Sequence, residues 1–218
     1  MGGIGVIAAL TKRFARLLPV EWLIPRWREA QAETVLTSLG GVEIRRTIAG
    51  CFVQTQVKGG AAQAREIALH SLVRYLDGDN QAAAALDAAR PVIQQQLGPR
   101  RWLISVRLAT VDHPSNAPAP VAPELEVVAR EAETLAVIEV AGRPTFGSIT
   151  AGDEAVLEAI AKTQWIAAGA PRLRLSTPEA VLRFVGDFEI AVPVSLRQSR
   201  QSARPALLTP VLEYRRAG

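Results

Sequence analysis

Apolar and polar positions alternate in two stretches of this chain that resemble each other. Residues 42–59, VEIRRTIAGCFVQTQVKG, align without a gap with residues 125–142, LEVVAREAETLAVIEVAG. Alternation with a period of two is typical of half-buried strands. The two stretches therefore predict two strands each, at Val42–Arg46, Cys51–Val57, Leu125–Ala129 and Leu135–Val140.

Each pair of predicted strands is followed by a helix and by further strands. Apolar residues recur at 3.6-residue spacing over Ala61–Leu76, and a second helix is predicted near Asp153–Gln164. Gly59-Gly60 ends the first strand pair, and the run Asp77–Asn80 stops the first helix. The later strands are predicted near Pro91–Gln95, Trp102–Leu108, Arg172–Ser176 and Phe188–Val194. Each half thus has the order ββαββ.

This pattern divides the chain into parts with different roles. The predicted parts are a partly helical leader (1–40), a first repeat (41–109), a proline-rich linker (110–124), a second repeat (125–194) and a basic tail (195–218). One helix cannot cover both faces of a four-stranded sheet, so each repeat leaves a face unburied. We therefore expect the two repeats to pair as one α+β domain with pseudo-twofold symmetry. A cleft is expected at their seam.

Composition narrows the class of protein. The chain has 218 residues, of which 49% are hydrophobic and 21% charged, as expected of a globular domain. The net charge of +4 comes from scattered arginines without a nucleic-acid motif, so no nucleic-acid partner is expected. Cys51 is the single cysteine, which indicates a reducing compartment, and we expect a cytoplasmic protein. Only two histidines, His70 and His113, are present, so a dedicated protein metal site is not expected.

The two ends of the chain leave a further alternative open. Residues 1–20 begin with an apolar run that is shorter than the ~20 residues needed to span a bilayer. They could pack on the domain, or they could contact a membrane surface or a protein together with the arginine-rich residues 197–218. In that second case the protein would be a peripheral membrane or complex-associated structural subunit.

The order of several motifs resembles that of a known family. VEIRR, FVQTQV, RYLDGDN, LAVIEVAG and FEIAVPV follow one another across residues 41–194 as in the SOUL heme-binding family. That family shares a superfamily with the gyrase-inhibitory-protein-like ligand-binding domains. The resemblance implies a distorted eight-stranded antiparallel barrel flanked by two helices. It also implies binding of heme or a related tetrapyrrole, and we expect a non-enzymatic carrier or buffer. The chain departs from the family at Ala88-Ala89, where SOUL proteins carry Met-Thr before the retained Pro91-Val92.

The side of the first helix opposite its apolar face carries Gln63, Ile67, His70 and Arg74. In the SOUL family the porphyrin is proposed to lie against this helix. The resemblance implies that Ile67 contacts the macrocycle, that His70 offers an imidazole to the iron, and that Arg74 pairs with a propionate. The alternative is that His70 is a solvated surface histidine and Arg74 a cation favoured by the helix dipole.

A loop at residues 177–185 would cover such a ligand. It carries apolar groups in a segment that otherwise has the composition of a turn: Pro178, Ala180, Val181, Leu182 and Phe184. The family resemblance implies a lid over a flat hydrophobic ligand. The alternative is a loop folded back on its own core.

A carboxylate in the last strand supports a second hypothesis. In the gyrase-inhibitor-like relatives, a glutamate of this strand faces the ligand cavity, where it pairs with cationic drugs or acts in hydrolysis. Glu189 matches that position, and Glu139 could lie nearby. A carboxylate in an apolar cavity has a raised pKa and could act as a general base in a small-molecule sensor or hydrolase. The alternative for Glu189 is an ion pair with Arg107 or another arginine.

Overall fold

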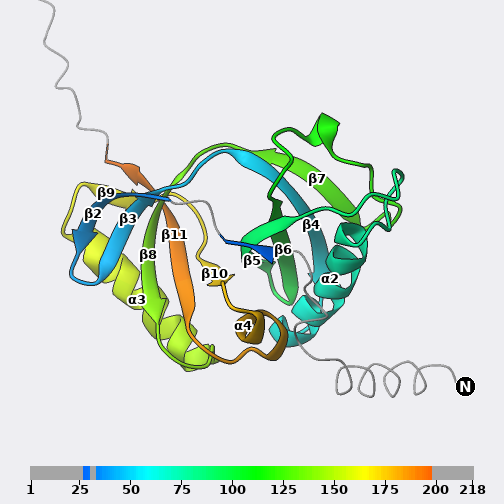
Figure 1. Cartoon of the computed structure of the whole chain (residues 1–218). Helices are drawn as coiled ribbons and strands as arrows, with labels where there is room; N and C mark the ends of the chain where they lie inside the picture. Colours follow the sequence, from blue (N-terminus) through cyan, green and yellow to red (C-terminus); the bar gives the residue numbers. More distant parts are fainter. Residues whose placement is uncertain (1–26, 30–32, 198–218) are drawn as a thin grey trace, which may run out of the picture.

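One sheet of 11 strands, antiparallel except for the parallel pairing of its shortest strand, organises the chain (Figure 1). The computed structural model describes residues 27–29 and 33–197, apart from the side chains of Pro178, Glu179 and Leu182. The expectations for residues 1–20 and for most of the basic tail lie outside these residues. The strands are β1 (Trp27–Arg28), β2 (Thr34–Leu39), β3 (Val42–Arg46), β4 (Gly50–Lys58), β5 (Ala88–Gly98), β6 (Arg101–Leu108), β7 (Leu125–Arg130), β8 (Thr134–Val140), β9 (Trp165–Ala167), β10 (Arg172–Leu175) and β11 (Phe188–Leu196). The helices are α2 (Ala61–Leu76), α3 (Phe146–Ala161) and the short α4 (Pro178–Arg183), with a 3-10 turn at Pro114–Asn116.

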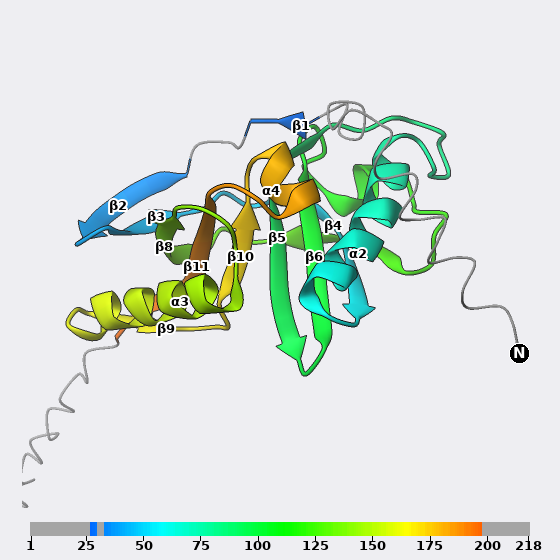
Figure 2. The ribbon, with the colours of Figure 1, turned by 90° about the horizontal axis from the view of Figure 1, so that it is seen from below.

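Three strand pairings join the two predicted repeats, residues 41–109 and 125–194. The order is β2-β3-β8-β11-β10-β5-β6-β4-β7, with β1 beside β5 and β9 beside β11. β3 pairs with β8, β4 pairs with β7, and β5 pairs with β10, so each predicted repeat contributes strands to both ends of the sheet. In Figure 2, β5 and β10 lie between α2 and α3. The predicted α+β class with two flanking helices is confirmed.

The predicted closed eight-stranded barrel is wrong. Within the described part of the chain the sheet is open, because β2 and β7 lie at its two ends and each pairs with only one strand. The chain turns at residues 47–49, so β3 continues into one half while β4 enters the other. The edge strand β2 falls in the predicted leader, where the exposed sequence TVLTSL lacks a buried face. Pairings correspond in the two halves, but the internal duplication stays a prediction.

Local patterns predicted the first helix better than the second. Helix α2 has the predicted bounds, whereas α3 begins at Phe146 instead of near Asp153. Its start is set by a capping box, in which the Ser148 N–H donates to Thr145 Oγ1 (3.1 Å) and the Thr145 N–H donates to Ser148 Oγ (2.8 Å). Two glycines within this first half of α3 weaken its helical pattern, which explains the late predicted start.

The core lies between the sheet and the two long helices. Helix α2 packs on β4 and β6, and α3 packs on β8 and β11. Alternate strand residues face these helices and are fully buried, among them Ile44, Val53, Ile104, Phe188 and Ile190. The intervening strand positions point to the opposite face of the sheet. That second face carries charged side chains, which matter below.

Gly152 sets how closely α3 approaches the sheet. A Cβ at this position would lie 2.9 Å from Ile190 Cγ1 and 3.3 Å from Val140 Cγ2. We expect Gly152→Ala to lower the free energy of unfolding by about 1–3 kcal/mol, because α3 must move away from β8 and β11. Chemical denaturation measures this change.

Gly147→Ala is the matched control in the first turn of the same helix. The nearest atom to a Cβ there is Thr145 Oγ1 at 4.0 Å. This control should leave stability unchanged or raise it by up to ~1 kcal/mol through helix propensity. Equal stabilisation by both substitutions would show that α3 does not pack as described.

Candidate functional site

The outward side of α2 is exposed, as the helical pattern predicts. Gln63, Ile67, His70 and Arg74 all face solvent, and Ile67 is 48% exposed. His70 makes no hydrogen bond with any described residue. Arg74 forms an ion pair with Asp79, just beyond the end of the helix. This surface therefore offers one large apolar contact, one imidazole and an exposed cation paired with a half-buried aspartate.

An open hollow lies at the N-terminal end of this side of α2. Its volume is ≈ 730 Å³, and it is lined by Lys58, Gly59, Gln63, Leu97, Gly98, Pro99, Arg100 and Arg101. The hollow thus lies between the start of α2 and the turn that joins β5 to β6. Gly59 has φ +144°, and a Cβ there would lie 3.0 Å from Gln63 Oε1, so a side chain would be strained and crowded. Three cationic residues give this hollow a positive rim.

The predicted lid segment contacts α2 from the other side. Ala180 and Val181 are buried in the core, which agrees with the alternative of a segment folded on its own core. The Phe184 ring lies 3.7 Å from the guanidinium carbon of Arg65. Arg65 lies on the buried side of α2 and donates to Gln94 Oε1 (3.2 Å), and burial lowers its pKa to about 10. The side chains of Pro178 and Leu182 lie outside the described residues, and a ligand-covering role for the segment stays a prediction.

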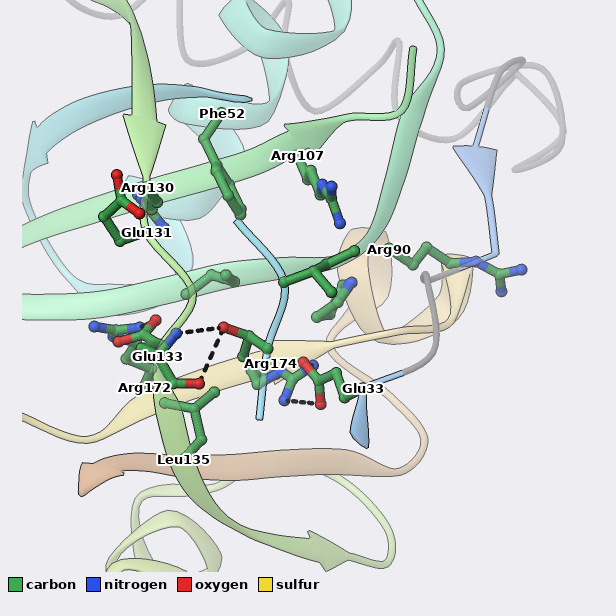
Figure 3. Close-up of a pocket in the computed structure, with 14 residues that line it drawn as sticks. Glu33, Phe52, Arg90, Arg107, Arg130, Glu131, Glu133, Leu135, Arg172 and Arg174 are labelled. Atoms are coloured by element: carbon green, nitrogen blue, oxygen red, sulfur yellow. Dashed lines mark hydrogen bonds and ion pairs between the residues drawn. The ribbon is translucent and has the colours of Figure 1, made fainter. Parts of the chain in front are cut away.

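A second, smaller pocket lies on the face of the sheet opposite the helices (Figure 3). Its volume is ≈ 60 Å³. The lining residues come from both halves: Glu33, Thr47, Ile48, Phe52, Arg90, Pro91, Ile93, Arg107, Arg130, Glu131, Glu133, Leu135, Arg172 and Arg174. Five arginines and three glutamates share this small volume, so electrostatics dominates the pocket.

Glu189 belongs to an ion-pair cluster beside this pocket. Its Oε1 lies 2.6 Å from Arg45 Nη1, and its Oε2 lies 3.4 Å from Arg174 Nε. Arg174 is only 6% exposed and donates two hydrogen bonds to Glu33, at 2.8 and 3.1 Å. Arg45 also donates to Glu43 (2.7 Å). Glu189 therefore contacts two guanidinium groups, which it shares with Glu33 and Glu43, in agreement with the alternative that gave it an arginine partner.

Arg107, which was named as a possible partner of Glu189, does not pair with it. Its Nη2 donates to the carbonyl oxygen of Ala49 (3.0 Å). Glu139 is directly opposite Glu189 in the β8–β11 register, but its side chain is exposed. The two glutamates considered for the sensor or hydrolase hypothesis thus share a face without lying in an apolar cavity.

The arginines of the small pocket are functional candidates that the sequence analysis missed. Arg130 Nη2 donates to Gln54 Oε1 (2.7 Å), and its guanidinium carbon lies 4.4 Å from the centre of the Phe52 ring. Burial and the nearby charge of Arg172 lower the pKa of Arg130 to about 10. One local signal was available: in RLRL, at residues 172–175, arginines alternate with leucines, which places both arginines on the face opposite the core.

Two other expectations concern a metal site and a membrane-spanning segment. Among the described residues, no group of three or more histidine, cysteine, aspartate or glutamate side chains could hold a metal ion. No helix in the same residues has the length and apolar character needed to cross a membrane. The cytoplasmic location stays a prediction.

Comparisons with solved structures show the same fold at low sequence identity. The C-terminal domain of EcmrR matches with a TM-score of 0.52 and 10% identity, over 71% of this chain and 97% of that one. A hydrolase from Listeria innocua matches with a TM-score of 0.51 and 10% identity, over 73% and 94%. EcmrR bound to DNA gives a TM-score of 0.53 and 8% identity, over 71% of this chain but only 57% of that one.

The family comparison covers most of the chain. No curated protein matches it. The family model described as SOUL heme-binding protein matches residues 29–175, which include β3 to β8, α2, α3 and β10. That range contains all four residues on the outward side of α2. The chain belongs to the SOUL heme-binding protein family.

Proposed function

We propose that the protein binds heme or a related tetrapyrrole on the outward side of α2 and in the adjoining hollow. It would act as a carrier or buffer and not as an enzyme. Family membership supports the class of ligand. The size and place of the hollow support the location.

The volume of the hollow is the observation that carries this proposal. Pockets for organic ligands and cofactors measure about 300–1,000 Å³. The hollow at Gln63 lies within this range at ≈ 730 Å³, whereas the pocket on the opposite face, at ≈ 60 Å³, is far below it. Gln63 and Ile67 are neighbours on one side of the helix because they are four residues apart. A flat ligand that entered the hollow could therefore extend over Ile67.

The residues around the hollow fit the chemistry of a tetrapyrrole. Ile67 would bury its exposed half against the apolar ring, which is the main favourable term. Lys58, Arg100 and Arg101 line the hollow and would meet the propionate carboxylates. Arg74 could also bind a propionate by exchanging its ion pair with Asp79, since exposed ion pairs of this kind contribute little.

A bound heme would supply an iron atom as well as the ring. His70 is the histidine on this side of α2, and its ring nitrogens are free of hydrogen bonds to described residues. A neutral imidazole is a common axial ligand of heme iron. His70 would hold the iron from the protein side, whereas Gln63 would contact the edge of the ligand.

The carrier role is preferred to the sensor or hydrolase role because of the state of Glu189. Hydrolysis or cation binding would need a carboxylate that is free to accept a proton or a positive charge. Glu189 is already held by Arg45 and Arg174. The likeness to a hydrolase from Listeria innocua, at 10% identity, shows the fold alone.

Titration with hemin tests the proposal. We expect a shifted Soret band that saturates near one hemin per chain. Ile67→Glu should weaken binding roughly tenfold, because it removes an apolar contact and adds a charge that repels propionates. Arg74→Glu should weaken it in the same direction, and His70→Ala should move the Soret band if the imidazole ligates the iron.

Leu157→Glu is the matched control for Ile67→Glu. Leu157 is an exposed aliphatic residue on α3, 43% exposed, and it should not contact the ligand. Its substitution is expected to leave hemin affinity unchanged. A flat titration with folded protein would rule out the proposal, as would equal weakening by both glutamate substitutions.

A further inference from the structure

The small pocket on the face opposite the helices has more positive charge than its carboxylates neutralise. Glu33 pairs with Arg174, and Glu133 pairs with Arg172. The third lining carboxylate, Glu131, is exposed. Three further arginines line the pocket, namely Arg90, Arg107 and Arg130, and none of them forms an ion pair with a described carboxylate.

Two of these three arginines flank the ring of Phe52. Arg107, on β6, is directly opposite Phe52 in the β4–β6 register. Arg130, on β7, lies over the Phe52 ring from the other neighbouring strand. Arg90 is directed elsewhere: it donates to the carbonyl oxygen of Ser176 (3.1 Å), and Figure 3 shows its side chain pointing away from the other labelled residues. Arg107 and Arg130 thus form a pair of cations around one aromatic ring.

The backbone around Phe52 is shaped to hold Arg107 in this place. A Cβ at Gly50 would lie 2.6 Å from Arg107 Nε, so the guanidinium occupies space that only glycine leaves open. Arg107 is further fixed by its hydrogen bond to Ala49, and Asp112 attracts it without forming an ion pair. An arginine that is already ordered loses less conformational entropy when it binds an anion.

Arg172 adds an unused donor to the same pocket. Its Nη1 is bound to Glu133, but its Nε is buried and makes no hydrogen bond to any described residue. A buried donor without a partner costs about 1–3 kcal/mol, so an acceptor that reached it would be favoured. Burial and the repulsion by Arg172 lower the pKa of Arg130, and Glu133 offsets part of that repulsion. A further anion that reached Arg172 Nε would supply the missing acceptor and reduce the repulsion that remains.

We propose that Arg107, Arg130 and Arg172 form a binding site for a small oxyanion, the carboxylate or phosphate group of a small ligand. A water molecule needs roughly 10–15 Å³ of this kind of space, so ≈ 60 Å³ holds about four to six non-hydrogen atoms. Acetate and phosphate have this size. Planar guanidinium groups bind both through paired N–H donors. The apolar neighbours Phe52, Ile93 and Leu135 would contact the rest of the ligand.

This site differs from a cation site in the sign of its charge. A lipophilic cation would need a free carboxylate inside the pocket, but Glu33 and Glu133 are held by Arg174 and Arg172, and the third lining carboxylate, Glu131, is exposed. It also differs from the hollow beside α2, since it lies on the other face of the sheet and is far smaller. The inference therefore does not depend on tetrapyrrole binding, and either proposal can fail without the other.

The site is tested by calorimetric titration with inorganic phosphate and with acetate. Chloride keeps the ionic strength constant throughout. Thermal unfolding should show a matching rise in Tm that saturates with ligand concentration. We expect Arg107→Gln and Arg130→Gln each to weaken binding about tenfold or more, because each removes a charged donor. If Arg130→Gln fails to fold by circular dichroism, Arg107→Gln alone decides, since Arg107 has no ion pair to lose.

Arg143→Gln is the control, because Arg143 is exposed and lines neither the small pocket nor the hollow beside α2, so its substitution should leave anion affinity unchanged. Arg101→Gln, in the hollow beside α2, serves to locate the bound anion. Loss of binding in Arg101→Gln, with affinity retained in Arg107→Gln, would place the anion at the other site and overturn the proposal. The proposal would also be overturned if phosphate and acetate gave no saturable binding above that seen with chloride alone. A rise in Tm with the lipophilic cation tetraphenylphosphonium, and none with the anions, would overturn it as well.

Discussion

Strands of residues 41–109 pair with strands of residues 125–194, and this pairing is the constraint on which the rest of the structure depends. β3 pairs with β8 and β4 with β7, so the chain must turn at residues 47–49 and 131–133 to serve both halves. The β5–β10 pairing then makes one sheet of the two. One face of this sheet is covered by α2 and α3 and holds the core. On the other face, charged side chains from both halves lie close to the turns at residues 47–49 and 131–133.

The two faces offer different chemistry to ligands. On the outer side of α2, the protein exposes an isoleucine, a histidine and a wide hollow with a positive rim, which suits a large flat molecule with acidic groups. On the opposite face, five arginines line the small pocket, and Arg45 and Arg174 hold Glu189. We propose that those arginines favour a small anion over a cation or a large ring, because a desolvated guanidinium is costly unless it is paired. The helix surface with its exposed isoleucine and the charged pocket thus lie on opposite faces of the sheet.

The sequence predicted local elements well where the pattern was periodic and clearly bounded. α2 matches residue for residue because Gly59-Gly60 and the run after Leu76 mark its ends, and β3 matches because its alternation is regular. β2 was missed because it buries neither face, and the start of α3 because glycines interrupt its pattern. The open sheet and the pairing of Arg107 with Phe52 depend on register between distant strands, which no local pattern encodes. For the same reason the outward side of α2 was predictable, whereas the arginine pocket was not.

Paramagnetic broadening of isoleucine methyl signals by hemin is the most direct test of where the large ligand lies. Ile67 is on the outer side of α2, and Ile93 lines the pocket on the opposite face of the sheet. NMR spectra of methyl-labelled protein, recorded with ferric hemin and with a diamagnetic zinc porphyrin, would compare the two residues in one sample. We expect strong broadening of the Ile67 methyl signal with the Ile93 signal retained. Broadening of Ile93 with Ile67 unaffected would contradict it.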